Sequence, residues 1–288
     1  MSGSTIVTPT IFREYIGMGD YIDHFPDEMI NADIKEFHFI LCFATETHVD
    51  GKGTGLFDRN WSFTSFSPEK VAELKKKLKN VKVVISIGGN GPEDTFNPKN
   101  NEDWIVNATS SIKGIILNYQ TKLPNDDVLY GIDGIDINYE KISSSISDFS
   151  NCIGEVIKQL KVDPDVSKFM KVVSIAPTEG SQSYYLKLYR DNKGYIDWID
   201  YKFYNQYFNT VEDFEKLFKI LVTEYGTALD KFLVGVSTYE AIKSKTIIEG
   251  CEYLLNRRSL VGVFVWDAKP SAPAYTPERE IQKLLAKN

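Results

Sequence analysis

The sequence predicts a single (β/α)8 barrel, and three observations lead to this fold class. The chain has 288 residues, close to the roughly 250 residues of a typical α/β barrel domain. Short apolar runs alternate with longer amphipathic segments along its whole length, as in α/β proteins. No linker or low-complexity tract interrupts this alternation, so we expect one domain over residues 1–288.

Eight apolar runs are rich in Val, Ile and Phe, as expected of buried parallel strands. The predicted strands are Ile11–Gly17, Phe37–Glu46, Lys82–Gly89, Gly131–Glu140, Lys171–Thr178, Trp198–Gln206, Lys231–Thr238 and Val261–Asp267. An open doubly wound sheet is the main alternative, but its nucleotide-binding form needs a glycine fingerprint after the first strand. Gly17–Asp20 lacks the third glycine, and Gly51–Gly55 precedes no helical pattern, so we interpret both as turns.

The amphipathic segments between the strands predict helices. Two of them begin with a capping residue followed by proline, at Ser67-Pro68 and at Thr276-Pro277, which is a typical helix start. The other predicted helices are Asn101–Tyr119, Ile146–Leu160, Val211–Tyr225 and Lys243–Asn256, and the last helix covers Thr276–Ala286. The segments after the first and fifth strands are shorter and have a weaker pattern.

Composition excludes several classes of protein. The net charge of −7 argues against nucleic acid or an anionic membrane as the main partner. No apolar run approaches the ~18 residues of a membrane span, and no secretory signal is visible. Cys42, Cys152 and Cys251 are too few for a disulfide framework. We therefore expect a cytoplasmic protein, with a vacuolar or storage compartment as the alternative, and no metal or cofactor.

The fourth predicted strand carries the strongest functional signal. Alternation places Asp136, Asn138 and Glu140 on one face, and Ile135 and Ile137 on the other. Polar side chains on a central strand are costly to bury without partners, and function in α/β barrels gathers at the carboxyl ends of the strands. The pattern indicates either a catalytic site or a structural polar network inside the barrel.

The segment Asp133–Glu140 reads D-G-I-D-I-N-Y-E. It is similar to the D-G-x-D-x-D-x-E signature of glycoside hydrolase family 18. The resemblance is closest to the plant branch, which includes the class III chitinases and narbonin, and it covers nearly the whole chain. Further similar segments are Phe12–Gly17, Phe37–Leu41, Ser86–Gly89, Ser174–Pro177 and Gly262–Trp266.

This resemblance implies a substrate-assisted hydrolysis of β-1,4-linked N-acetylglucosamine polymers, an exception to the usual carboxylate pair. By position, Glu140 matches the general acid and Asp136 the supporting inner carboxylate. Tyr204 matches a tyrosine that contacts the acetamido group of the sugar. Tyr15 matches the floor of the site, and Trp266 matches the platform under the sugar.

Two departures from the family pattern affect the same chemistry. Asn138 replaces the aspartate that orients the acetamido group, and the loss of one such electrostatic contribution costs roughly 10²–10³ in rate. Lys202 replaces a glutamine of the plant chitinases. Because Lys202 lies two residues before Tyr204, we expect it to point into the barrel and pair with Asp136 or Glu140. Such a pair stabilises the ionised carboxylate, whereas a general acid must carry a proton.

The sequence therefore predicts a chitinase-like plant protein with a degenerate active site and a storage or carbohydrate-binding role, closest in character to narbonin. The first alternative is an active or weakly active endo-chitinase. The second is a protein-interaction module of the RuBisCO-associated or inhibitor type. The expected ligand is an oligosaccharide that contains N-acetylglucosamine, and a protein partner is the other expected binder.

Overall fold

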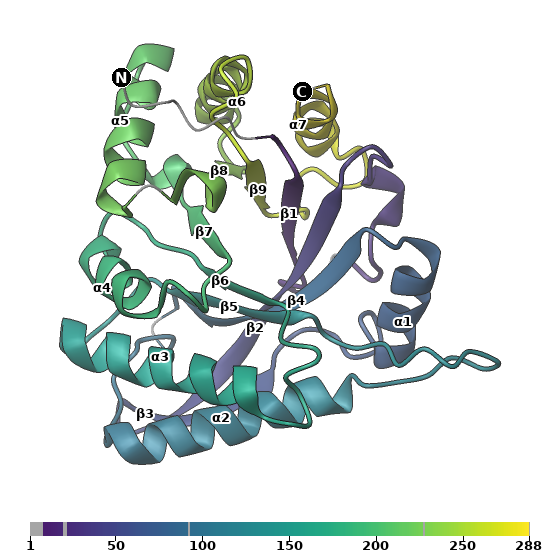
Figure 1. Cartoon of the computed structure of the whole chain (residues 1–288), viewed down its shortest axis with the longest axis vertical. Coiled ribbons are helices and arrows are strands. Elements are labelled where there is room, and N and C mark those ends of the chain that lie inside the picture. Colours follow the sequence, from purple (N-terminus) through teal and green to yellow (C-terminus); the bar gives the residue numbers. More distant parts are fainter. Residues whose placement is uncertain (1–7, 20–21, 92, 227, 288) are drawn as a thin grey trace.

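The computed structural model describes residues 8–19, 22–91, 93–226 and 228–287 (Figure 1). The predicted absence of a secretory signal concerns residues 1–7, which lie outside the described residues. The strands are β1 (Ile11–Ile16), β2 (Glu36–Val49), β3 (Lys52–Arg59), β4 (Val81–Gly89), β5 (Gly134–Tyr139), β6 (Val172–Ile175), β7 (Trp198–Tyr201), β8 (Phe232–Ser237) and β9 (Gly262–Trp266). The helices are α1 (Pro68–Lys77), α2 (Asn101–Asn118), α3 (Ile146–Val162), α4 (Gln182–Asn192), α5 (Val211–Glu224), α6 (Ala241–Leu255) and α7 (Thr276–Ala286).

The parallel strands form a closed ring in the order β1-β9-β8-β7-β6-β5-β4-β2, and the pairing of β1 with β2 completes it. The helices surround this ring (Figure 1). The predicted (β/α)8 fold class is therefore confirmed. None of the described helices is long and apolar enough to cross a membrane.

A local sequence signal explains where α1 begins, whereas the predicted cap Thr276 is the first residue of α7 and makes no capping hydrogen bond. The Ser67 hydroxyl accepts a hydrogen bond from the backbone N–H of Lys70 at 3.3 Å, and Pro68 is the first residue of α1. Helix α3 then shows how a helix attaches to the barrel. Its apolar stripe includes Phe149, Ile153 and Leu160, which are all buried. The stripe follows the 3.6-residue period that places such side chains on one face.

The predicted strand Trp198–Gln206 is wrong in its second half. Strand β7 ends at Tyr201, and Phe203–Asn205 forms a short 3₁₀ helix. The backbone N–H of Lys202 donates to the carbonyl of Pro177 at 3.1 Å, after which the chain leaves the sheet. The two-residue alternation of a strand therefore does not continue to Tyr204.

The interpretation of Gly51–Gly55 as a turn is also wrong in part. Asp50 and Gly51 have positive φ angles and form the turn, but Lys52–Arg59 is strand β3, which pairs antiparallel with β2. This hairpin extends beyond the barrel, and β3 lies beside α2 (Figure 1). Between β1 and β2, the described residues contain only the 3₁₀ helix Asp27–Met29 in place of an α-helix.

We call the barrel end at which the parallel strands finish the mouth, and the interior farther from it the lower interior. The lower interior contains a fully buried ion pair between Arg13 of β1 and Asp200 of β7. Burial raises the pKa of Asp200 to about 7, although the guanidinium opposes this shift. The negative charge of Asp136 adds to the rise. A buried charge is tolerated only with a partner, so Arg13 and Asp200 fix β1 and β7 relative to each other.

The outer face of β1 contains a buried carboxyl group, Glu14, which has no hydrogen-bond partner at either oxygen. Burial raises its pKa well above the ordinary value, and the charges of Glu278 and Asp267 raise it further. A carboxyl group with a raised pKa in the folded state stabilises the fold at acid pH, and this stability is lost as the pH rises through the folded pKa.

Replacement of Glu14 by Gln is expected to remove this pH dependence, because the amide keeps the shape of the side chain and carries no charge. The measured quantity is the free energy of unfolding of Glu14→Gln minus that of the unaltered protein. This difference should increase as the pH rises from about 5 to about 8. Urea unfolding at a series of pH values measures this increase. Glu73→Gln, at an exposed position of α1, is the control, and a difference that does not change with pH would contradict the prediction.

Candidate active site

The floor of the site is the fully buried carboxylate of Asp136 on β5. The Tyr15 phenol donates a hydrogen bond to its Oδ2 at 2.7 Å, and the Ser86 hydroxyl donates to the same oxygen at 2.6 Å. The Ser174 hydroxyl donates to Oδ1 at 2.6 Å. Three hydroxyl groups from three other strands therefore satisfy this carboxylate and fix its orientation.

The next layer towards the barrel mouth contains Lys202. Its ammonium donates to Asn138 Oδ1 at 2.6 Å and forms an ion pair with Glu140. The Lys202 side chain is only 2% exposed, and that of Glu140 is 26% exposed. The predicted ion pair of Lys202 with Asp136 or Glu140 is therefore confirmed, and Glu140 is the partner. The hydroxyl groups already occupy both oxygens of Asp136.

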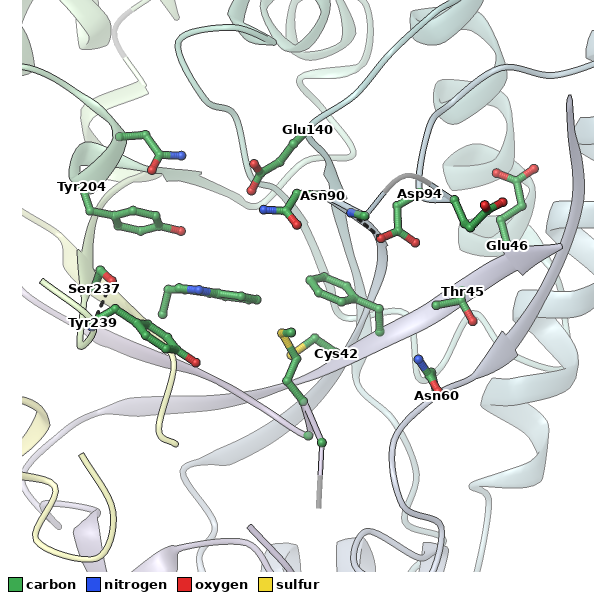
Figure 2. Close-up of a pocket in the computed structure, with 18 of the residues that line it drawn as sticks. Cys42, Thr45, Glu46, Asn60, Asn90, Asp94, Glu140, Tyr204, Ser237 and Tyr239 are labelled. Carbon is green, nitrogen blue, oxygen red and sulfur yellow. Dashed lines mark hydrogen bonds between the residues drawn. The ribbon is translucent and has the colours of Figure 1, made fainter. Parts of the chain in front are cut away.

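A cleft of about 800 Å³ opens above this layer. Of the residues predicted for the site, Glu140, Tyr204 and Trp266 line it, whereas Tyr15 is fully buried below it. Figure 2 shows the side chains of Glu140 and Tyr204 pointing into the cleft from different sides. Glu140 directly follows β5, and Tyr204 belongs to the 3₁₀ helix after β7. Both positions are at the carboxyl ends of strands, where barrel sites form.

The apolar part of the cleft is built from aromatic rings. Trp266 at the end of β9 stacks with Phe43 of β2, with ring centroids 5.9 Å apart and an interplanar angle of 29°. The edge of Tyr15 supports Trp266 from below, with centroids 5.2 Å apart. The partly buried indole of Trp266 therefore has a fixed orientation and faces the cleft.

Tyr204 is buried to 8% exposure. Burial raises the pKa of its phenol well above the ordinary value, and the negative charge of Glu140 raises it further. The phenol therefore stays protonated at neutral pH. It can donate a hydrogen bond to a ligand in the cleft.

Sequence reasoning missed several residues that line the cleft, among them Phe43, Asn90, Asp94 and Tyr239. In Figure 2, Asn90 lies between Glu140 and Asp94, and the backbone N–H of Gly91 donates to Asp94 Oδ2 at 2.7 Å. Asn90 and Tyr239 closely follow strands, so an inspection of every strand end could have found them. Phe43 lies within β2, where no sequence signal separates it from core residues.

The described lining of the cleft is acidic. It includes Glu46, Glu93, Asp94, Glu140 and Glu240, and no Lys or Arg. This charge disfavours anionic ligands and is compatible with neutral sugars. Within the described part of the chain, no group of three or more His, Cys, Asp or Glu side chains has an arrangement that could hold a metal ion.

Comparison with known proteins identifies the family. The profile of glycosyl hydrolases family 18 matches residues 37–246. The chain belongs to this family. Chitinase 1 of Tulipa saxatilis subsp. bakeri is 33% identical to it over 296 residues, covering 98% of this chain and 88% of that protein. The RuBisCO-associated protein of Glycine max is 29% identical over 243 residues, covering 79% of this chain and 78% of that protein.

Solved structures of family 18 proteins agree with this assignment. The family 18 chitinase of Crocus vernus has a TM-score of 0.83 at 28% identity, covering 96% of this chain and all of that chain. The class V chitinase of Nicotiana tobaccum, solved in complex with NAG4, shares the fold at 11% identity with a TM-score of 0.59 and covers 96% and 99% of the two chains. The protein is therefore a plant chitinase-like member of family 18, whereas a closer kinship with narbonin stays a prediction.

The ion pair predicts a stability effect at Lys202. Removing the ammonium in Lys202→Ala leaves the Glu140 carboxylate without its cation, and we expect the free energy of unfolding to fall by about 1–3 kcal/mol. This is less than the roughly 3–5 kcal/mol of a fully buried pair, because Glu140 is 26% exposed. Urea unfolding at neutral pH measures the change.

Lys202→Met is the matched variant for this measurement. It keeps most of the side-chain volume and leaves no cavity in the barrel interior, so its cost should be clearly smaller than that of Lys202→Ala. A Lys202→Ala protein within about 0.5 kcal/mol of the unaltered protein, the range of ordinary surface substitutions, would contradict the assigned role of the pair.

Proposed function

We propose that this family 18 protein binds N-acetylglucosamine oligosaccharides in its cleft and hydrolyses them poorly or not at all. One observation carries the proposal: the Lys202 ammonium contacts both Glu140 and Asn138. These are the two positions that the family mechanism uses for proton donation and for orienting the acetamido group. The chitinase relatives support the ligand class.

The first consequence concerns the proton. The family mechanism needs a protonated acid at Glu140 to release the leaving sugar. The ammonium of Lys202 stabilises the ionised carboxylate instead, and an ionised carboxylate has no proton to donate. The negative side chain also keeps the ammonium in place, because Lys202 has almost no exposure to water.

The second consequence concerns charge at the reacting sugar. The acetamido oxygen that attacks the anomeric carbon produces a cationic ring, which the aspartate of active members stabilises. Asn138 is neutral, and its Oδ1 already accepts a hydrogen bond from Lys202 at 2.6 Å. A positive ammonium at this point repels the developing cation, and position 138 supplies no negative charge to offset it.

The features that support binding do not depend on this chemistry. Trp266 and Phe43 present stacked rings to the cleft, and the Tyr204 phenol is available as a donor. A cleft of about 800 Å³ lies within the roughly 300–1,000 Å³ range of ligand sites. Binding without turnover is therefore physically consistent with the site.

Two alternatives have specific support. The presence of Glu140, Asp136 and Tyr204, together with relatives named chitinases, favours a weakly active enzyme. The RuBisCO-associated relative favours a protein-binding role. The storage role and the cytoplasmic location expected from the sequence stay predictions.

An activity assay on N-acetylglucosamine tetramers tests the proposal. The unaltered protein should show little or no hydrolysis. The double variant Asn138→Asp with Lys202→Gln should hydrolyse the tetramer at least about 10²-fold faster, because it restores one electrostatic contribution and removes an opposing charge. Product release is followed by chromatography, and binding of the tetramer to the unaltered protein is measured by calorimetry.

Adding Glu140→Gln to the double variant is the control, since it should abolish the gained activity and leave tetramer binding intact. A turnover by the unaltered protein in the ordinary enzyme range of roughly 1–10³ s⁻¹ would show that the active-chitinase alternative is right. If the unaltered protein does not bind the tetramer, the proposed carbohydrate-binding function is wrong. The protein-binding alternative is then favoured.

A further inference from the structure

Tyr207, in the loop after β7, is a large aromatic side chain that is 96% exposed. Its neighbours on both sides are anchored to the protein. The Gln206 amide donates to the Tyr201 hydroxyl at 3.0 Å, and the Phe208 ring packs edge-on against Phe214 with centroids 5.6 Å apart. Because both neighbours are fixed inward, the backbone holds the Tyr207 ring outward.

Tyr207 lines an open groove of about 690 Å³ next to the cleft. Glu240 lines both hollows, so the groove adjoins the cleft at the side where β7 and β8 end. Tyr239, which is 56% exposed, lies in the cleft beside Glu240. Glu240 therefore lies between the part of the cleft that contains Tyr239 and the groove that contains Tyr207.

The chemistry of the groove suits a sugar. A pyranose ring has an apolar C–H face that packs on an aromatic ring, and its hydroxyl and acetamido groups need polar neighbours. The groove supplies both, with Tyr207 and Phe208 beside Asn209, Glu240 and Thr246. Each hollow alone has the size of a small-ligand site, so a single ligand that occupies both is an oligomer.

We propose that Tyr207 is an outer sugar-binding platform, which holds a distal unit of an N-acetylglucosamine oligomer whose other units lie in the cleft. This inference rests on the proposed carbohydrate-binding function and adds a length preference to it. Lys243 of α6 lies over the Tyr207 ring at 5.9 Å and within 3.8 Å of Glu240. These contacts help to fix the wall of the groove and still leave the ring almost fully accessible.

The test compares the affinities of the N-acetylglucosamine dimer and hexamer for the unaltered protein and for Tyr207→Ala, measured by calorimetry. The unaltered protein should bind the hexamer more tightly than the dimer. Tyr207→Ala should weaken hexamer binding by roughly three- to tenfold, as expected for the loss of one ring-stacking contact. The affinity for the dimer, which fits within the cleft, should not change.

Two control variants keep this test specific. Tyr207→Phe retains the ring and should bind the hexamer like the unaltered protein. Tyr195→Ala removes another exposed tyrosine, 38% exposed, which precedes β7 at the opposite end of the barrel. It should change neither affinity.

Three outcomes would overturn the inference in distinguishable ways. Equal hexamer affinities for the unaltered protein and Tyr207→Ala would show that Tyr207 is not an outer platform. The proposed carbohydrate-binding function would not be affected. An equal loss for dimer and hexamer would mean that Tyr207 acts through the shape of the cleft. Binding of neither oligomer by the unaltered protein would overturn the inference together with the proposed function.

Discussion

Every charged side chain inside the barrel needs a compensating partner, and this constraint organises the interior from the lower end to the mouth. Arg13 and Asp200 form an ion pair in the lower layer. Three hydroxyl groups satisfy Asp136 in the middle layer. Lys202 and Glu140 form the pair at the mouth. Since the partners lie in different strands or directly after them, these contacts also fix the relative positions of strands that are distant in the sequence.

The same compensation that stabilises the mouth limits its chemistry. A general acid must carry a proton, and a group that stabilises a cation must be negative or have an available acceptor. Lys202 opposes both requirements with one ammonium, because it pairs with Glu140 and uses the oxygen of Asn138. The aromatic part of the cleft lies on the other strands, β2 and β9, and is unaffected. Binding and catalysis are therefore separable in this architecture.

The sequence predicted the fold class and the Lys202–Glu140 pair, because both depend on patterns that repeat or match a family motif. It predicted the inward direction of Lys202 from an alternation that in fact stops at Tyr201. The direction was right because the hydrogen bond from the Lys202 N–H to the Pro177 carbonyl holds the backbone beside the segment after β6 for one position beyond the end of β7. Strand β3 was missed because its two glycines, Gly53 and Gly55, weaken any strand pattern. The serine partners of Asp136 were missed because Ser86 and Ser174 come from two separate strands.

Asn138 and Lys202 are physically coupled, since they share one hydrogen bond. An aspartate at position 138 would give the ammonium a second carboxylate, hold it more firmly and leave Glu140 paired. A glutamine at position 202 alone would release Glu140, but position 138 would still lack the negative charge that a cationic intermediate needs. The neutral amide accepts the buried ammonium without adding a further charge to an interior that already contains Asp136 and Asp200. The two departures from the family pattern therefore stabilise each other, and the effect of changing both should exceed the sum of the single changes.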